Sequence, residues 1–119
     1  MKKGADAVQY YEYFSLPEGM TADFAVAVTD NSLLPLLRVG DTVYLRRSVE
    51  LRDGDVGLFY LGGQMVFRQF CADSFGSIYL FSVNRERREE DAALPPAEAE
   101  KLICYGRAEL PRQISLPMD

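Results

Sequence analysis

The stretch that decides the fold is residues 23–35, which read DFAVAVTDNSLLP. Large apolar side chains recur at every second position across residues 24–28, the spacing of a β-strand with one buried face. The run then reaches an Asp-Asn-Ser cluster at 30–32, whose side chains favour a turn or a helix N-cap. The sequence therefore predicts a strand over 23–29 that leads into a turn carrying Ser32.

Further strands are predicted downstream, because apolar, β-branched and aromatic runs alternate with Gly-rich turns. The predicted strands are residues 8–16, 42–45, 56–61, 65–70, 78–81 and 101–110. The turns between strands 56–61, 65–70 and 78–81 predict two consecutive hairpins. Residues 85–91 contain three arginines and four acids and are predicted to be a solvated loop. A short helical turn is expected where Pro95-Pro96 begins.

Two Gly-Asp pairs, at 40–41 and 54–55, each stand just before a predicted strand. Glycine supplies the backbone freedom that a turn needs, and aspartate accepts hydrogen bonds from nearby amides. We therefore interpret both pairs as turn formers. The alternative, a catalytic carboxylate dyad of Asp41 and Asp55, would require the two side chains to converge.

Composition narrows the class of protein. The chain has 119 residues and is 48% hydrophobic, which suits one domain over 1–119. A net charge of −5 disfavours direct binding to DNA, and the absence of histidine excludes imidazole bases and ligands. Cys71 and Cys104 stand alone, as expected of reduced thiols in a cytoplasmic protein. No run has the roughly 18 apolar residues of a membrane span. We expect no metal, no cofactor and no membrane association.

The ordered series of motifs resembles the C-terminal autopeptidase domain of LexA and phage repressors. That family reads approximately strand, Gly-Asp-Ser-Met-x-Pro, x-Gly-Asp-x-Val and Asp-Gly-Asp-Ile/Val. The matching segments here are residues 23–35, 39–43 and 52–56, and the resemblance extends from Tyr10 to about Arg107. It implies a mainly β fold, a small, twisted, antiparallel and partly closed barrel like that of signal peptidase. It also places Ser32 at the position of the catalytic nucleophile.

The lysine that activates the serine in that family is missing. It would lie in a Val-Lys-Arg string after the Gly-rich hairpin turn, but residues 66–68 read Val-Phe-Arg. Phe67 therefore occupies the lysine position and cannot accept a proton. Arg68 stays protonated, and strand alternation predicts that it points to the opposite face. The chain's lysines are Lys2, Lys3 and Lys101, and none is a natural replacement. The resemblance thus implies a vestigial site around Ser32 without self-cleavage.

The role that follows from the resemblance is to dimerise a transcriptional repressor. The last strand forms much of the dimer contact in the family. Here the expected contact residues are Ile103, Tyr105, Arg107 and Leu110. DNA would be bound only by a separate N-terminal domain, which we expect to be absent from this chain, and a RecA filament is a candidate partner. Two alternatives remain: an active Ser/Lys autopeptidase or signal-peptidase-like protease that uses Ser32 with an unexpected base, and a stand-alone module that binds a protein or ligand in the vestigial cleft.

Overall fold

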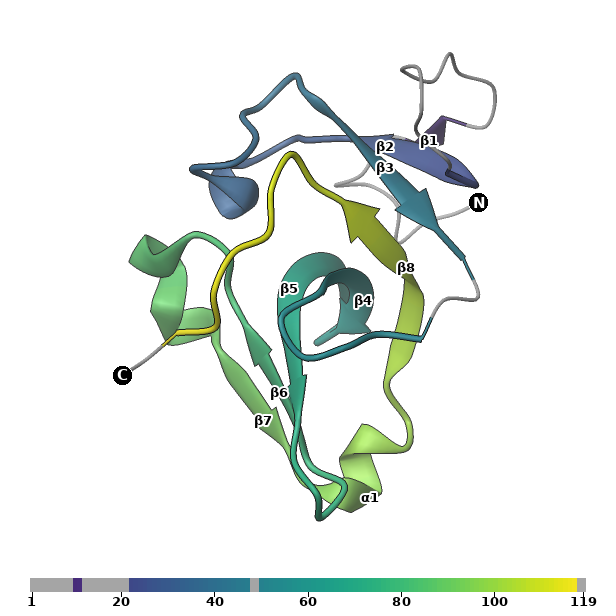
Figure 1. The fold of residues 1–119 in the computed structure, drawn as a ribbon, viewed down its shortest axis with the longest axis vertical. Coiled ribbons are helices and arrows are strands. Elements are labelled where there is room, and N and C mark those ends of the chain that lie inside the picture. Colours follow the sequence, from purple (N-terminus) through teal and green to yellow (C-terminus); the bar gives the residue numbers. More distant parts are fainter. Residues whose placement is uncertain (1–9, 12–21, 48–49, 118–119) are drawn as a thin grey trace.

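The computed structural model describes residues 10–11, 22–47 and 50–117. Eight strands lie in these ranges and form one antiparallel sheet in the order β1-β2-β3-β8-β4-β5-β6-β7 (Figure 1). The strands are β1 (Tyr10–Tyr11), β2 (Phe24–Ala27), β3 (Thr42–Arg46), β4 (Val56–Leu61), β5 (Gln64–Ala72), β6 (Ile78–Phe81), β7 (Ala92–Leu94) and β8 (Ile103–Glu109). The helical elements are the 3-10 turns η2 (Asn31–Leu33) and η3 (Arg85–Glu90) and the helix α1 (Pro96–Ala99). Apart from Tyr10 and Tyr11, the strand predicted at 8–16 lies outside the described residues.

The sheet is twisted and curls on itself without closing, since β1 and β7 remain at its two edges. The predicted fold class, a mainly β and partly closed barrel, is therefore confirmed. Both predicted hairpins form: β4 pairs with β5 from Val56↔Gln69 to Leu61↔Gln64, and β6 continues the sheet beyond β5. The edge strand β7 was not predicted from the sequence.

The last strand, β8, lies in the middle of the sheet between β3 and β4. Its pairing with β4 shifts by one residue between Leu58 and Phe59, so that Tyr105 is the extra residue of a β-bulge. Because directly opposed residues share a face, Ile103 lies on the face of Tyr60, whereas Arg107 lies on the opposite face with Gly57. The expected dimer-contact residues therefore do not share one face of this strand.

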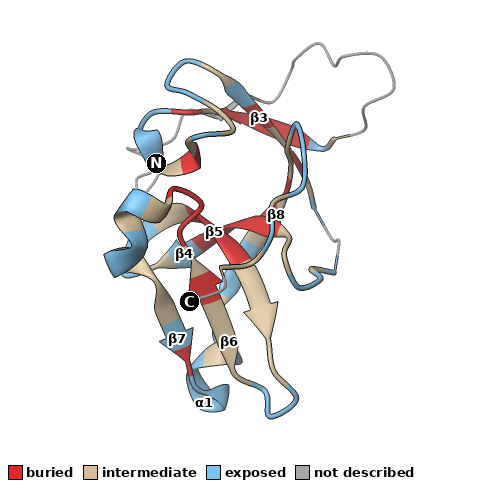
Figure 2. Cartoon of the chain, turned by 60° about the vertical axis from the view of Figure 1, so that its left-hand side comes forward, coloured by how far each residue is buried: buried red, intermediate tan, exposed pale blue. Residues whose placement is uncertain are grey.

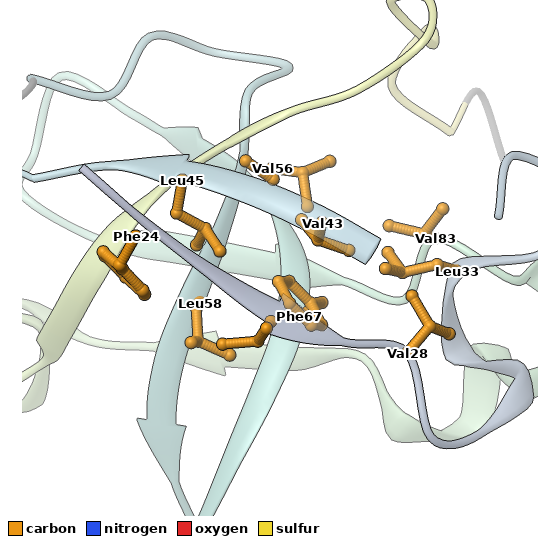
Figure 3. Close-up of a cluster of buried hydrophobic side chains, with 11 residues drawn as sticks. Phe24, Val28, Leu33, Val43, Leu45, Val56, Leu58, Phe67 and Val83 are labelled. Atoms are coloured by element: carbon orange, nitrogen blue, oxygen red, sulfur yellow. The ribbon is translucent and has the colours of Figure 1, made fainter. Parts of the chain in front are cut away.

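Buried side chains form two clusters on opposite sides of β4 and β5. The larger cluster contains side chains of β2, β3, β4, β5 and β8 and of the segments that follow β2 and β6. Leu58 and Phe67 belong to it, whereas Phe59 belongs to the smaller cluster. Figure 2 shows the buried segments gathered on the strands at the centre of the molecule, with exposed residues on the turns and helices. The larger cluster, drawn in Figure 3, positions the loop after β2, because Val28 and Leu33 are both anchored in it.

The two Gly-Asp pairs build nearly identical turns. The Asp41 carboxylate accepts the amide of Arg38 at 2.8 Å, and the Asp55 carboxylate accepts the amide of Arg52 at 2.9 Å. The preceding glycines have φ angles of 98° and 96°, in the left-handed region that glycine enters without steric cost. These contacts confirm that the two aspartates are turn formers.

Candidate functional site

Ser32 lies at the centre of η2, which begins four residues after the last residue of β2. Asp30 caps this turn, because its carboxylate accepts the Ser32 amide at 3.0 Å. Leu33 is fully buried in the larger core cluster and anchors the turn to the barrel. The predicted Asp-Asn-Ser turn is confirmed, and Ser32 itself remains partly exposed.

A cavity of about 140 Å³ opens beside Ser32. The residues that line it come from the end of β2, the first half of β5 and η3: Ala27, Val28, Thr29, Asp30, Ser32, Gln64, Met65, Val66, Phe67, Arg68, Arg87 and Glu90. The structure thus brings Ser32 and Phe67, 35 positions apart in the sequence, to the same cavity. Among the described residues that line it, none is a lysine.

Phe67 forms the apolar part of this cavity. Its side chain lies in the middle of the larger core cluster, with 7% of its surface exposed (Figure 3). It lies opposite Leu58 on β4, which is fully buried. A benzyl group held among aliphatic side chains has no atom that can take a proton from an alcohol. The position that the family resemblance assigns to the base is therefore filled by hydrophobic core.

Arg68 also lines the cavity, although alternation along a strand directs it away from Phe67. β6 pairs only with Gln69 to Ala72 of β5, so residues 64–68 have no β6 partner along that edge. Side chains from both faces of this part of β5 therefore border the cavity. The guanidinium of Arg68 is buried, with Nη1 donating to the Phe67 carbonyl at 2.8 Å and Nη2 to Glu90 at 3.2 Å. Its Nε has no hydrogen-bond partner within the described part of the chain.

Burial lowers the pKa of the Arg68 guanidinium, an effect that the charge of Glu90 partly opposes. An arginine side chain nevertheless remains protonated at physiological pH, because its intrinsic pKa is far above 7. Arg68 can donate hydrogen bonds and neutralise charge but cannot serve as a general base for Ser32.

Residues 85–91 are not the solvated loop that their composition suggested. They form η3 and pack against the turn that carries Ser32. Arg87 pairs with Glu90 at 2.9 Å and with Asp30 at 3.6 Å, and Glu90 reaches the buried Arg68. Arg85 pairs with Asp91 at 2.9 Å. The charges of this segment form a network whose partners lie up to 57 positions away, which is why local composition did not reveal it.

Ser32 does have a hydrogen-bond acceptor, the carboxylate of Asp30. Burial by itself would raise the pKa of Asp30, but hydrogen bonds from the hydroxyl and amide of Ser32 and the charge of Arg87 outweigh it, and the pKa lies below its ordinary value of 3.8. So weak a base cannot effectively deprotonate a serine hydroxyl near neutral pH. The pair is suited to fixing the orientation of the hydroxyl.

The four expected dimer-contact residues have different surroundings. Ile103 is 49% exposed, while Tyr105 and Leu110 pack against the larger core cluster. Arg107 pairs with Glu109 at 3.0 Å and borders a second cavity of about 360 Å³ between residues 52–56 and the chain that follows β8. Of the four, Ile103 offers the most apolar surface, and it faces Tyr60, which is 42% exposed.

Sequence reasoning missed Asp30, Asn84, Arg87 and Glu90 as residues of the site. Asn84 connects η3 to the Ser32 turn, since its side-chain amide donates to the carbonyl of Asn31 at 2.9 Å. The described residues contain no group of three or more acidic or cysteine side chains placed to hold a metal ion. Among them, no helix has the length and apolar character needed to cross a bilayer.

The sequence was compared with models of protein families. The family described as Peptidase S24-like matches residues 2–108, nearly the whole chain. A search of curated proteins found no match. The family assignment therefore rests on a match that includes β1 to β7, most of β8, Ser32 and Phe67.

Proposed function

Because the chain belongs to the Peptidase S24-like family, we propose that it is the dimerisation and regulatory domain of a LexA-like or phage-type repressor that does not cleave itself. DNA binding would belong to a separate domain, which agrees with the net charge of −5. Joining two DNA-binding heads raises the effective concentration of the second head at a palindromic operator. The domain would act by holding two such heads together.

The observation that carries this proposal is the apolar filling of the site. Ser32 is accompanied by Phe67 where the family resemblance calls for a lysine, and Phe67 is built into the core. The polar side chains that line the cavity include Arg68, which stays protonated, and Asp30, whose pKa is lowered. Neither can take the proton from Ser32, so nucleophilic attack on a peptide bond lacks its first step.

Self-cleavage is tested on the longest natural form of the protein, incubated at alkaline pH with and without RecA filament. We expect no fragments over several days by mass spectrometry. Time-dependent fragments that disappear in Ser32→Ala would show instead that the domain is an active serine peptidase with a base from elsewhere.

The Phe67→Lys variant tests whether the base is what is missing, with Phe67→Met as the matched control. A buried amine has a lowered pKa and can act as a base near neutral pH. Cleavage that requires both the introduced amine and the hydroxyl of Ser32 would show that the rest of the machinery is intact. If neither variant cleaves, more than the base has been lost, and the non-cleaving role gains support.

Dimerisation is tested by sedimentation velocity over a range of concentrations. We expect a dimer, with Ile103 contributing apolar contact from β8. Ile103→Glu should shift the equilibrium toward monomer, because a charge placed in an apolar contact is costly. Phe75→Glu is the matched control, since Phe75 is 83% exposed at the turn between β5 and β6. A wild-type protein that stays monomeric at high concentration would contradict the dimer.

A further inference from the structure

Residues 84–90 are attached to the Ser32 turn by contacts that span more than fifty positions of sequence. The Asn84 amide donates to the Ser32 carbonyl at 3.2 Å, and its side chain donates to the Asn31 carbonyl at 2.9 Å. Arg87 donates from Nη1 to the side-chain oxygen of Asn31 at 3.0 Å. The Ser32 turn and residues 84–90 are therefore held together by several hydrogen bonds beside the cavity.

Arg87 carries the central charge in the contact between the Ser32 turn and residues 84–90. Its guanidinium lies between two carboxylates, that of Asp30 at 3.6 Å and that of Glu90 at 2.9 Å. Glu90 in turn pairs with the buried Arg68 of β5 at 3.2 Å. The chain of charges thus crosses from the Ser32 turn through η3 to β5, and all four of these residues line the cavity.

We propose that Arg87 is a clasp, the salt-sensitive contact that holds the Ser32 turn onto residues 84–90, and that its release loosens the polar side of the turn and widens the cavity while Leu33 stays anchored in the core. Partly exposed ion pairs are each weak and are screened by salt, so contacts of this kind can be broken without unfolding a domain. Asp30 and Glu90, which Arg87 joins, retain side-chain exposures of 57% and 32%. The clasp does not depend on whether the domain dimerises or cleaves.

The test is hydrogen exchange of the full chain, read by mass spectrometry on peptides that cover the Ser32 turn and on peptides from β4 and β5. The variant Arg87→Gln removes the charge and keeps a polar side chain. We expect its Ser32-turn amides to exchange about threefold to tenfold faster, with β4 and β5 unchanged. Arg88→Gln is the matched control, because Arg88 is exposed in the same segment and donates to the carbonyl of Arg85. We expect less than a twofold change there.

A second variant keeps the proposal testable if Arg87→Gln unfolds. Asp30→Asn retains an oxygen that can cap η2 and removes the charge that faces Arg87. It should raise exchange in the same peptide by a smaller factor, and in the double variant the two effects should be less than multiplicative. Moving from 50 mM to 1 M NaCl should accelerate exchange there in the wild type and much less in Arg87→Gln.

Three results would overturn the clasp: equal effects of Arg87→Gln and Arg88→Gln, acceleration spread evenly over the whole domain at unchanged pH, or fully multiplicative effects in the double variant. The first would mean that Arg87 acts no differently from an exposed charge, the second that it stabilises the whole domain rather than the turn, and the third that it is not coupled to Asp30. The readout does not involve cleavage or self-association, so these results leave the proposed repressor role unaffected.

Discussion

The two sides of the Ser32 cavity are stabilised by different interactions. On one side, Phe67 is embedded among aliphatic residues of the core. On the other, Arg68, Glu90, Arg87 and Asp30 form a series of ion pairs that becomes progressively more exposed. Removing a large buried side chain sharply lowers the free energy of unfolding because it leaves a cavity in the core. An exposed ion pair contributes little to that free energy and can be replaced. We therefore expect the apolar side of the cavity to be rigid and the charged side to be adjustable.

The largest expected effect lies on the apolar side. Phe67→Ala should lower the free energy of unfolding by about 3–5 kcal/mol, because it leaves a cavity in the larger core cluster. Urea denaturation followed by fluorescence or circular dichroism measures the loss. Phe75→Ala at an exposed turn is the control, with an expected change below about 0.5 kcal/mol. Similar values for the two would show that Phe67 is not part of the core.

The next effect is at the junction of the two sides. Glu90→Gln should cost roughly 1–3 kcal/mol, less than a fully buried pair would, because Glu90 remains partly exposed while Arg68 loses its carboxylate partner. The exposed Glu89→Gln serves as the control in the same denaturation assay. A loss no larger than that of Glu89→Gln would mean that Arg68 does not need this partner.

Arg68→Met should change the free energy of unfolding by no more than about 1 kcal/mol in either direction, since a buried charge is replaced by an apolar chain of similar length. The substitution also removes the unsatisfied Nε donor. Glu90 keeps its pairing with Arg87. A loss as large as that expected for Phe67→Ala would show that the charged side is as rigid as the apolar one.

The smallest effect is expected at acidic pH. Burial would raise the pKa of Asp91, but hydrogen bonds from Arg85 and Ser82 and the charge of Arg85 lower it below 3.8. Its contribution to stability is therefore complete above the unfolded-state pKa and is lost as pH falls through the lower folded-state value. Asp91→Asn should show a shallower fall in unfolding free energy below about pH 4. Urea titrations across the acidic range measure this slope, and an unchanged slope would contradict the assignment.

Most strands could be predicted because their signals are local. Alternation over residues 24–28 marks β2, and the Gly-rich turn at 62–63 marks the hairpin of β4 and β5. The family resemblance also brought Ser32 and Phe67 into one hypothesis, and the structure places both at one cavity. Ser32 and Phe67 line the same cavity because of the sheet topology. The order of the motifs implied this topology through the family resemblance, whereas the pattern of individual residues did not.

The charged side of the cavity could not be predicted, because its interactions join residues that are distant in the sequence. Arg87 meets Asp30 from 57 positions away, and a run of alternating charges looks the same whether it is solvated or paired. The β-bulge at Tyr105 could not be predicted for a related reason, because period-two alternation assumes an uninterrupted ladder of paired residues. β7 is only three residues long, too short for a periodic pattern.

The central place of β8 constrains the order in which the chain can fold. Within the described strands, backbone pairing between β1–β3 and β4–β7 passes through β8, which is the last strand to leave the ribosome. The hairpin of β4 and β5 can form early from neighbouring residues, but β3 and the outer edge of β4 must wait for residues 103–109. A nascent chain that stalls before Ile103 would leave unpaired the two strand edges that β8 covers in the folded domain, and such edges are prone to pair with another chain.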